Sequence, residues 1–190
     1  MTTQAPWKDI VVLGLVGRAR TGKDTIANYL VNTHVGMRKQ GFSWALKAYC
    51  HVACGMTEKD PALLQRIGTG VYRVRDPTFW INILSYMMCN DPPTMLIIPD
   101  VRFENEAVFV RRVGGYLVHL RRCDADGTPY VCPDRPSDHP SEQETDDIQG
   151  HAAYTVASGD LIQLQDIAEL SYNQAIDHHE RFFTPTLPTM

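Results

Sequence analysis

Stretches of apolar residues alternate with amphipathic stretches along most of the chain. Short apolar runs predict strands at 10–16, 95–98, 116–120 and 154–157, and a further short strand is predicted at 41–44. Apolar residues at helical spacing predict helices that start near 23, 45 and 60 and that span 79–88, 103–113 and 160–178. Strands that alternate with helices are typical of a parallel sheet wrapped by crossover helices. The pattern therefore predicts a three-layer α/β fold with a roughly five-stranded parallel sheet and helices on both faces.

One segment, residues 121–144, breaks this alternation. It combines prolines with many charged residues and has no clear apolar period. Long irregular segments in compact domains are commonly loops over a functional site. We therefore expect a lid at about 121–144 in a single domain that covers residues 1–190.

Composition restricts the partners that the chain can bind. Hydrophobic residues make up 44% and charged residues 21% of the 190 residues, which is typical of a globular domain. The formal net charge of −4 provides no global positive field for nucleic acid or an anionic membrane, so any phosphate chemistry must rely on local arginines. The run at 10–16 is too short to span a bilayer and lacks a basic leader, so we expect a cytoplasmic protein. Five cysteines without a CxxC pair favour reduced thiols.

The sharpest chemical signal follows the first predicted strand and opens the first predicted helix. It reads Gly17, Arg18, Ala19, Arg20, Thr21, Gly22, Lys23, Asp24 and Thr25. Glycines allow the main chain to curl so that its N–H groups and the helix N-terminus face phosphate oxygens, and the lysine reaches the terminal phosphates. Asp24 stands where this P-loop pattern has a hydroxyl residue. A carboxylate there can hold Mg²⁺, and its charge beside the phosphates makes a metal more necessary.

A second signal is a carboxylate at the end of a buried strand. The run Leu96–Ile98 leads through Pro99 to Asp100, and the carboxyl ends of parallel strands are where ligands gather. Asp100 can orient magnesium or its waters, or it can simply cap the helix that follows. Arginines suit phosphate transfer because their planar fork binds phosphate oxygens bidentately. Candidates are Arg66 and Arg73 in one region, Arg102 beside Asp100, and Arg122 and Arg135 in the lid, where a loop arginine can equally be only solvated.

These residues resemble the bacteriophage deoxynucleoside monophosphate kinases. The resemblance rests on the loop 17–25, on the stretch 100–107 with its Asp-Val-Arg-Phe and Asn-Glu-Ala pieces, and on Gly114-Gly115. Further pieces agree in order along the chain: Leu46-Lys47, Leu64 to Thr69, Arg73, Trp80, and Asp138-His139-Pro140-Ser141-Glu142. The resemblance spans residues 10 to about 160.

The resemblance implies a P-loop kinase fold with magnesium-ATP on the loop and a deoxynucleoside monophosphate opposite. It places an acceptor-binding helical region at about 45–90 and an arginine-bearing lid above the donor and the acceptor. By position, it implies catalytic roles for Lys23, Asp100, Arg102 and Arg122, and magnesium at Asp24 and Asp100. The donor would be held by residues 17–25 and Arg135. The acceptor would be bound by Lys47, Gln65, Arg66, Arg73, Trp80, Arg102, Glu106 and Glu142, although Trp80 can equally be a core residue.

Two other functions remain open from the sequence. One is a P-loop kinase for another small acceptor, of the dephospho-coenzyme A or phosphomevalonate type, which would share the donor half. The other is a regulatory module that binds ATP without an acceptor. The chain has Ala157-Ser158-Gly159 where the resemblance leads us to expect an Asn near the adenine. The base that is accepted, the preference for deoxyribose and the presence of a homodimer do not follow from the sequence.

Overall fold

The computed structural model describes residues 7–133 and 140–184. Its centre is a five-stranded sheet in the order β2-β3-β1-β4-β5, and every neighbouring pair of strands is parallel. The strands are β1 (Val11–Val16), β2 (Met37–Lys39), β3 (Met95–Val101), β4 (Tyr116–Cys123) and β5 (Ala152–Ala157). The α/β prediction with a parallel sheet of about five strands is confirmed, and the architecture is consistent with a P-loop kinase fold.

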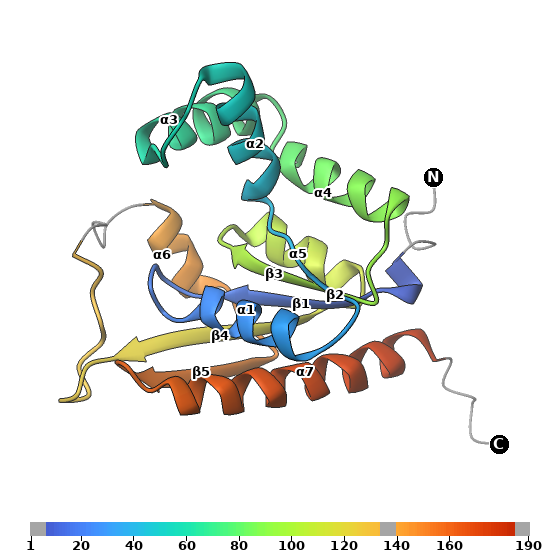
Figure 1. The fold of residues 1–190 in the computed structure, drawn as a ribbon, viewed down its shortest axis with the longest axis vertical. Helices are drawn as coiled ribbons and strands as arrows, with labels where there is room; N and C mark the ends of the chain where they lie inside the picture. Colours follow the sequence, from blue (N-terminus) through green and yellow to red (C-terminus); the bar gives the residue numbers. More distant parts are fainter. Residues whose placement is uncertain (1–6, 134–139, 185–190) are drawn as a thin grey trace.

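Helices cover both faces of this sheet (Figure 1). The helices are α1 (Lys23–Thr33), α2 (Ser43–Cys54), α3 (Pro61–Gln65), α4 (Phe79–Asn90), α5 (Glu104–Arg112), α6 (Pro140–Asp147) and α7 (Leu161–Phe183), with a 3₁₀ turn η1 (Trp7–Asp9) and a π-helical segment η2 (Arg66–Arg73). In Figure 1, α7 runs along one side of the sheet, while α2 and α3 stand away from the strands on the other. None of the helices in the described part of the chain is both long and apolar enough to cross a membrane.

The strands alternate their side chains between two hydrophobic clusters. In β1, Val12 and Val16 belong to the cluster under α4 and α5, whereas Leu13 and Leu15 belong to the cluster under α1 and α7. Each of these four side chains is at most 1% exposed. Burial of one such side chain stabilises the fold by about 1.5–3 kcal/mol. A strand covered on both faces therefore needs the continuous apolar run that the sequence displays.

The strand predicted at 41–44 is wrong. The short strand β2 lies earlier, at Met37–Lys39, where it pairs with Met95–Ile97 of β3. The main chain at 42–43 instead donates its N–H groups to the carboxylate of Asp100 and then begins α2. The second strand was misplaced because its position depends on a partner more than 50 residues away and not on local apolar spacing.

Strand β3 continues through Pro99 and Asp100, where the sequence predicted its end. Its pairing with β1 shifts register there: Gly14 lies opposite Ile98, but Val16 lies opposite Val101. One extra residue in β3 is thus accommodated as a bulge, which suits a proline because it has no N–H to donate. The bulge lies at the carboxyl edge of the sheet, beside the glycine loop.

The segment in which we expect a lid, 121–144, begins with regular structure. Strand β4 runs to Cys123, so Arg121 and Arg122 lie in a regular strand paired with β5. After a turn at 124–128, an isolated bridge joins Cys123 to Pro129, and helix α6 covers Pro140–Asp147. Arg135, Asp138 and His139 lie outside the described residues. The other helix starts agree closely: Asp60 caps α3 through Leu63 N–H, and Asp160 caps α7 through Gln163 N–H.

Candidate phosphate-binding site

The glycine loop joins β1 to α1 at the carboxyl edge of the sheet. Gly17 and Gly22 have positive φ angles of 146° and 99°, and Arg20 also has a positive φ of 60°. A Cβ atom at Gly17 would lie 2.3 Å from the carbonyl oxygen of Leu120 in β4. Glycine is therefore required for the turn. Gly22 has no side chain to cap α1, so the positive end of the α1 dipole faces the loop.

Lys23 is folded back onto this loop. Its Nζ donates to the carbonyl oxygens of Gly17 at 2.6 Å and Arg18 at 2.5 Å, and it lies 3.2 Å from Thr21 Oγ1. Lys23 is only 5% exposed. The ammonium group is thus held in the concave side of the loop by oxygen atoms, which is the environment that phosphate oxygens would also provide.

Helix α6 places carboxylates on the same loop. Glu142 Oε2 accepts a hydrogen bond from the Ala19 N–H at 2.8 Å, and Glu142 Oε1 accepts one from Arg102 Nη1 at 2.8 Å. One turn later, Asp146 accepts hydrogen bonds from Arg18 and raises the pKa of that guanidinium. Glu142 is 4% exposed. A single buried carboxylate therefore joins the glycine loop to Arg102.

The carboxylate of Glu106 joins the two arginines expected on the acceptor side. Arg73 Nη2 donates to Glu106 Oε1 at 2.5 Å, and Glu106 Oε2 accepts from the Arg102 N–H at 2.8 Å. The Arg73 guanidinium also lies over the Phe103 ring, 4.2 Å from its centroid. Burial raises the pKa of Glu106 to about 7, although the charge of Arg73 opposes this rise. Glu106 is 1% exposed, so its oxygens face the protein and not a ligand.

The two predicted magnesium ligands have different surroundings. Both oxygens of Asp100 accept main-chain hydrogen bonds at 2.9 Å from the start of α2, so Asp100 caps an earlier helix and not the following helix α5 that the sequence offered as the alternative. Asp24 has an exposed side chain whose Oδ1 lies 2.6 Å from Lys39 Nζ. Partial burial opposes the fall, but Lys39 outweighs it and lowers the Asp24 pKa. No group of three or more His, Cys, Asp or Glu residues in the described ranges could hold a metal.

Arg122 connects the end of β4 to the glycine loop. Its Nη1 donates to the carbonyl oxygen of Arg20 at 2.9 Å, and its Nε donates to Ser158 Oγ at 2.9 Å. The guanidinium lies 4.0 Å from the centroid of the Tyr130 ring. The carbonyl oxygen that accepts from Arg122 thus belongs to Arg20, the loop residue other than glycine that has a positive φ. The other arginine expected in the lid, Arg135, which would hold the donor, is outside the described residues.

The remaining predicted acceptor residues are spread over the helices that stand away from the sheet. Lys47, Gln65 and Arg66 are exposed on α2, α3 and η2. Trp80 is 3% exposed, and its indole N–H donates to the carbonyl oxygen of Gly68 at 3.2 Å. The structure therefore places Trp80 in the core, as the alternative interpretation had it.

Sequence reasoning missed Asp146, Ser158 and Tyr130. Asp146 had a detectable signal, because residues four apart on a helix share one face and Asp146 is four residues after Glu142. Ser158 had none, since its contact with Arg122 depends on how β4 and β5 pair. Tyr130 reaches Arg122 because the chain folds back after the turn at 124–128, where the Tyr130 N–H donates to the carbonyl oxygen of Arg122.

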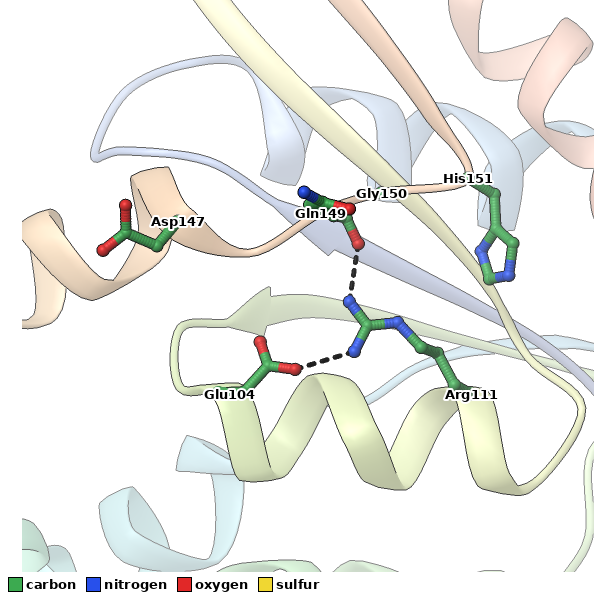
Figure 2. Close-up of a pocket in the computed structure, with 6 residues that line it drawn as sticks. All are labelled: Glu104, Arg111, Asp147, Gln149, Gly150 and His151. Atoms are coloured by element: carbon green, nitrogen blue, oxygen red, sulfur yellow. Dashed lines mark hydrogen bonds and ion pairs between the residues drawn. The ribbon is translucent and has the colours of Figure 1, made fainter.

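A cavity of about 480 Å³ lies beside this site but shares none of the loop residues. It is lined by Glu104, Arg111, Asp147, Gln149, Gly150 and His151. Figure 2 shows Arg111 reaching across it from α5, with one nitrogen 2.8 Å from Glu104 Oε1 and another 2.6 Å from the carbonyl oxygen of Gln149. The Arg111 guanidinium thus donates to acceptors of the protein itself. The cavity is therefore separate from the glycine loop.

No family model matches the chain. The sequence is, however, 27% identical over 176 residues to a protein of Acanthamoeba polyphaga mimivirus whose name is "Putative deoxynucleotide monophosphate kinase". The match covers 75% of this chain and 86% of the viral protein. The chain is therefore similar over most of its length to a protein that bears the name of a nucleotide kinase.

Proposed function

We propose that this protein is a kinase that transfers the γ-phosphoryl group of ATP to a deoxynucleoside monophosphate, giving a deoxynucleoside diphosphate and ADP. The carrying observation is the convergence of a glycine-loop N–H and Arg102 on the carboxylate of Glu142. Two groups suited to phosphate binding, one from each side of the site, are thus within reach of one anion. The viral relative's name supports a nucleotide kinase, and it does not favour a bacteriophage source over another viral one.

On the donor side, the N–H groups of the loop and the first turn of α1 would bind the β and γ phosphates, and Lys23 would exchange its carbonyl partners for phosphate oxygens. Arg122, already in contact with the loop carbonyl of Arg20, would lie on the same side. Magnesium, when bound, neutralises charge on the transferred phosphates. Asp24 and Thr25, exposed at the start of α1, fit a site that uses one carboxylate, phosphate oxygens and water.

On the acceptor side, Arg102 and Arg73 would bind the monophosphate. Its oxygen attacks the γ-phosphorus as the bond to the β-phosphate oxygen breaks, and ADP leaves. No general base is required, because a phosphate monoester is largely ionised at neutral pH. Catalysis would then come from positioning and from the arginine charges. Lys47, Gln65 and Arg66, exposed on the outlying helices, remain our proposed contacts to the nucleoside.

The test is a coupled assay of ADP formation with ATP, magnesium and each of the four common deoxynucleoside monophosphates. We expect turnover that depends on at least one acceptor. Lys23→Ala should lose this turnover and Lys8→Ala, which changes an exposed lysine on η1 outside the site, should keep it. Circular dichroism would verify that both variants are folded. Absence of turnover with all four acceptors would reject the proposal.

The same assay separates the two other functions. Turnover only with dephospho-coenzyme A or phosphomevalonate would assign another small-acceptor kinase that shares the donor half. ADP formation at the same rate with and without any acceptor would indicate a regulatory ATP-binding module. A kinase needs its acceptor arginines, so Arg102→Ala should abolish acceptor-dependent turnover in a deoxynucleoside monophosphate kinase and in another small-acceptor kinase. A regulatory ATP-binding module has no acceptor-dependent turnover for this substitution to abolish.

A further inference from the structure

Arg73 and Arg102 come from separate parts of the chain. Arg73 ends the π-helical segment η2, whereas Arg102 follows β3 at the carboxyl edge of the sheet. Two long side chains from different elements can act on one small anion only if their relative position is fixed. The described contacts show one group that touches both: the carboxylate of Glu106, in the first turn of α5.

The two oxygens of Glu106 are divided between the two arginines. Oε1 accepts from the guanidinium of Arg73 at 2.5 Å. Oε2 accepts from the main-chain N–H of Arg102 at 2.8 Å and lies 3.3 Å from that of Phe103. The Phe103 ring in turn lies under the Arg73 guanidinium. One carboxylate therefore orients the Arg73 side chain and the main chain from which the Arg102 side chain departs.

Burial explains why this link is rigid and also why it is not itself a ligand contact. Glu106 is 1% exposed and the Arg73 side chain is 16% exposed, so the carboxylate lies beneath the arginine. A buried hydrogen bond to a charged group is strong, and leaving either partner without the other is costly. Arg73 retains accessible surface through which its remaining donors can reach a ligand.

We propose that Glu106 is a positioning residue for the acceptor phosphate, because it holds Arg73 and the main chain of Arg102 in one frame. The inference rests on the proposed kinase function and refines its acceptor site. Glu106 thereby loses the direct substrate contact that the sequence resemblance implied, and acts through the arginines.

The kinetic test compares Glu106→Gln with Glu104→Gln. Both change a glutamate to its amide in the first turn of α5, but Glu104 is exposed and pairs with Arg111. For Glu106→Gln we expect the KM for the acceptor to rise by at least about tenfold, with the KM for ATP within about twofold of wild type. Glu104→Gln should leave both unchanged. An equal rise in both KM values, or none in the acceptor KM, would overturn the proposal.

A double-mutant cycle with Arg73→Gln tests whether Glu106 acts through Arg73. We expect the fold increase in acceptor KM of the double variant to be well below the product of the fold increases of the two single variants, because Glu106 has less to position once Arg73 is gone. Fully multiplicative effects would contradict the inference. Thermal unfolding of each variant would show whether the folded state is retained.

A readout without turnover keeps this inference separate from the proposed function. NMR of the Arg73 guanidinium should show separate Nη–H signals in the wild-type protein and in Glu104→Gln, since one nitrogen is bound to Glu106 and rotation is hindered. In Glu106→Gln these signals should average. Averaged signals in wild type would reject the positioning role even if the enzyme turns over. If the kinase assay shows no activity while the Arg73 Nη–H signals of the wild-type protein remain separate, only the proposed function is rejected.

Discussion

Glu106 is a carboxylate at the base of the candidate acceptor site, with protein donors on both oxygens. Its position is set by two local features: the start of α5, which the sequence placed within one residue, and the end of β3, which lies three residues beyond the predicted strand. The residue types of the site were therefore predictable, since the glycine loop and the Asp-Val-Arg-Phe stretch are local patterns. The partner of each residue was not, because Arg73 reaches Glu106 across 33 positions.

The raised pKa of Glu106 predicts how stability should depend on pH. Because burial raises this pKa from 4.5 to about 7, the folded state binds the proton more tightly than the unfolded state. The contribution of Glu106 to folding is therefore most favourable below about pH 4.5 and is lost as the pH rises through about 7. The change corresponds to about 3 kcal/mol.

Urea unfolding of wild type and Glu106→Gln between pH 5 and pH 8 measures this contribution. The stability of wild type relative to Glu106→Gln should fall from pH 5 to about pH 7 and level off by pH 8, since other titrating groups are common to both proteins. A difference that stays constant, or that grows with pH, would contradict the burial argument.

At the scale of elements, the starts of the helices and four of the five strands were predicted well, whereas the short strand β2 was misplaced. Asp60 and Asp160 cap α3 and α7 through their own neighbours, so sequence alone could place them. Helix α2 is different, because its cap comes from Asp100 in β3. The same contact explains why 41–44 is not a strand. Gly41 fits here because a Cβ atom would lie 2.0 Å from the Asp100 carboxylate.

Substitution by asparagine distinguishes a cap made within the same helix, Asp60 on α3, from a cap made by a distant strand, Asp100 on α2. Asp100→Asn replaces one acceptor oxygen by an N–H₂ group that would face a main-chain N–H, so it should destabilise the protein by about 1–3 kcal/mol. Asp60→Asn should be nearly neutral, because one oxygen suffices there and asparagine caps about as well as aspartate. Both are measured by urea unfolding without nucleotide. Equal effects of the two substitutions would show that Asp100 does not hold α2.

At the scale of the whole molecule, the parallel sheet determines where the site lies. The carboxyl ends of β1 and β3 are neighbours, so the glycine loop and Arg102 had to meet at one edge, as the sequence indicated. The docking of α6 on that edge could not be predicted. It depends on Glu142 and Asp146 finding Ala19, Arg18 and Arg102, more than 30 positions away in each case.

The contacts of Glu142 predict an effect on nucleotide affinity. ATP phosphates and the Glu142 carboxylate would compete for the Ala19 N–H of the glycine loop, so Glu142→Gln should tighten the binding of ATP and of inorganic triphosphate, by up to about tenfold. Isothermal titration calorimetry measures both ligands. Glu144→Gln is the matched control, because Glu144 accepts from the Glu104 N–H and not from the loop. Weaker triphosphate binding in Glu142→Gln would oppose this competition and favour a substrate contact for Glu142.

In the proposed kinase, the buried carboxylate of Glu142 would make phosphate binding an exchange of anions. The protein's own negative charge already satisfies the donors that a phosphate would use, so an incoming ligand gains only the difference between the two sets of contacts. Uncharged analogues of the donor would have nothing with which to dislodge it. If the proposed function holds, selection for strongly anionic ligands would thus be built into the resting state, before any contact with a base or sugar is made.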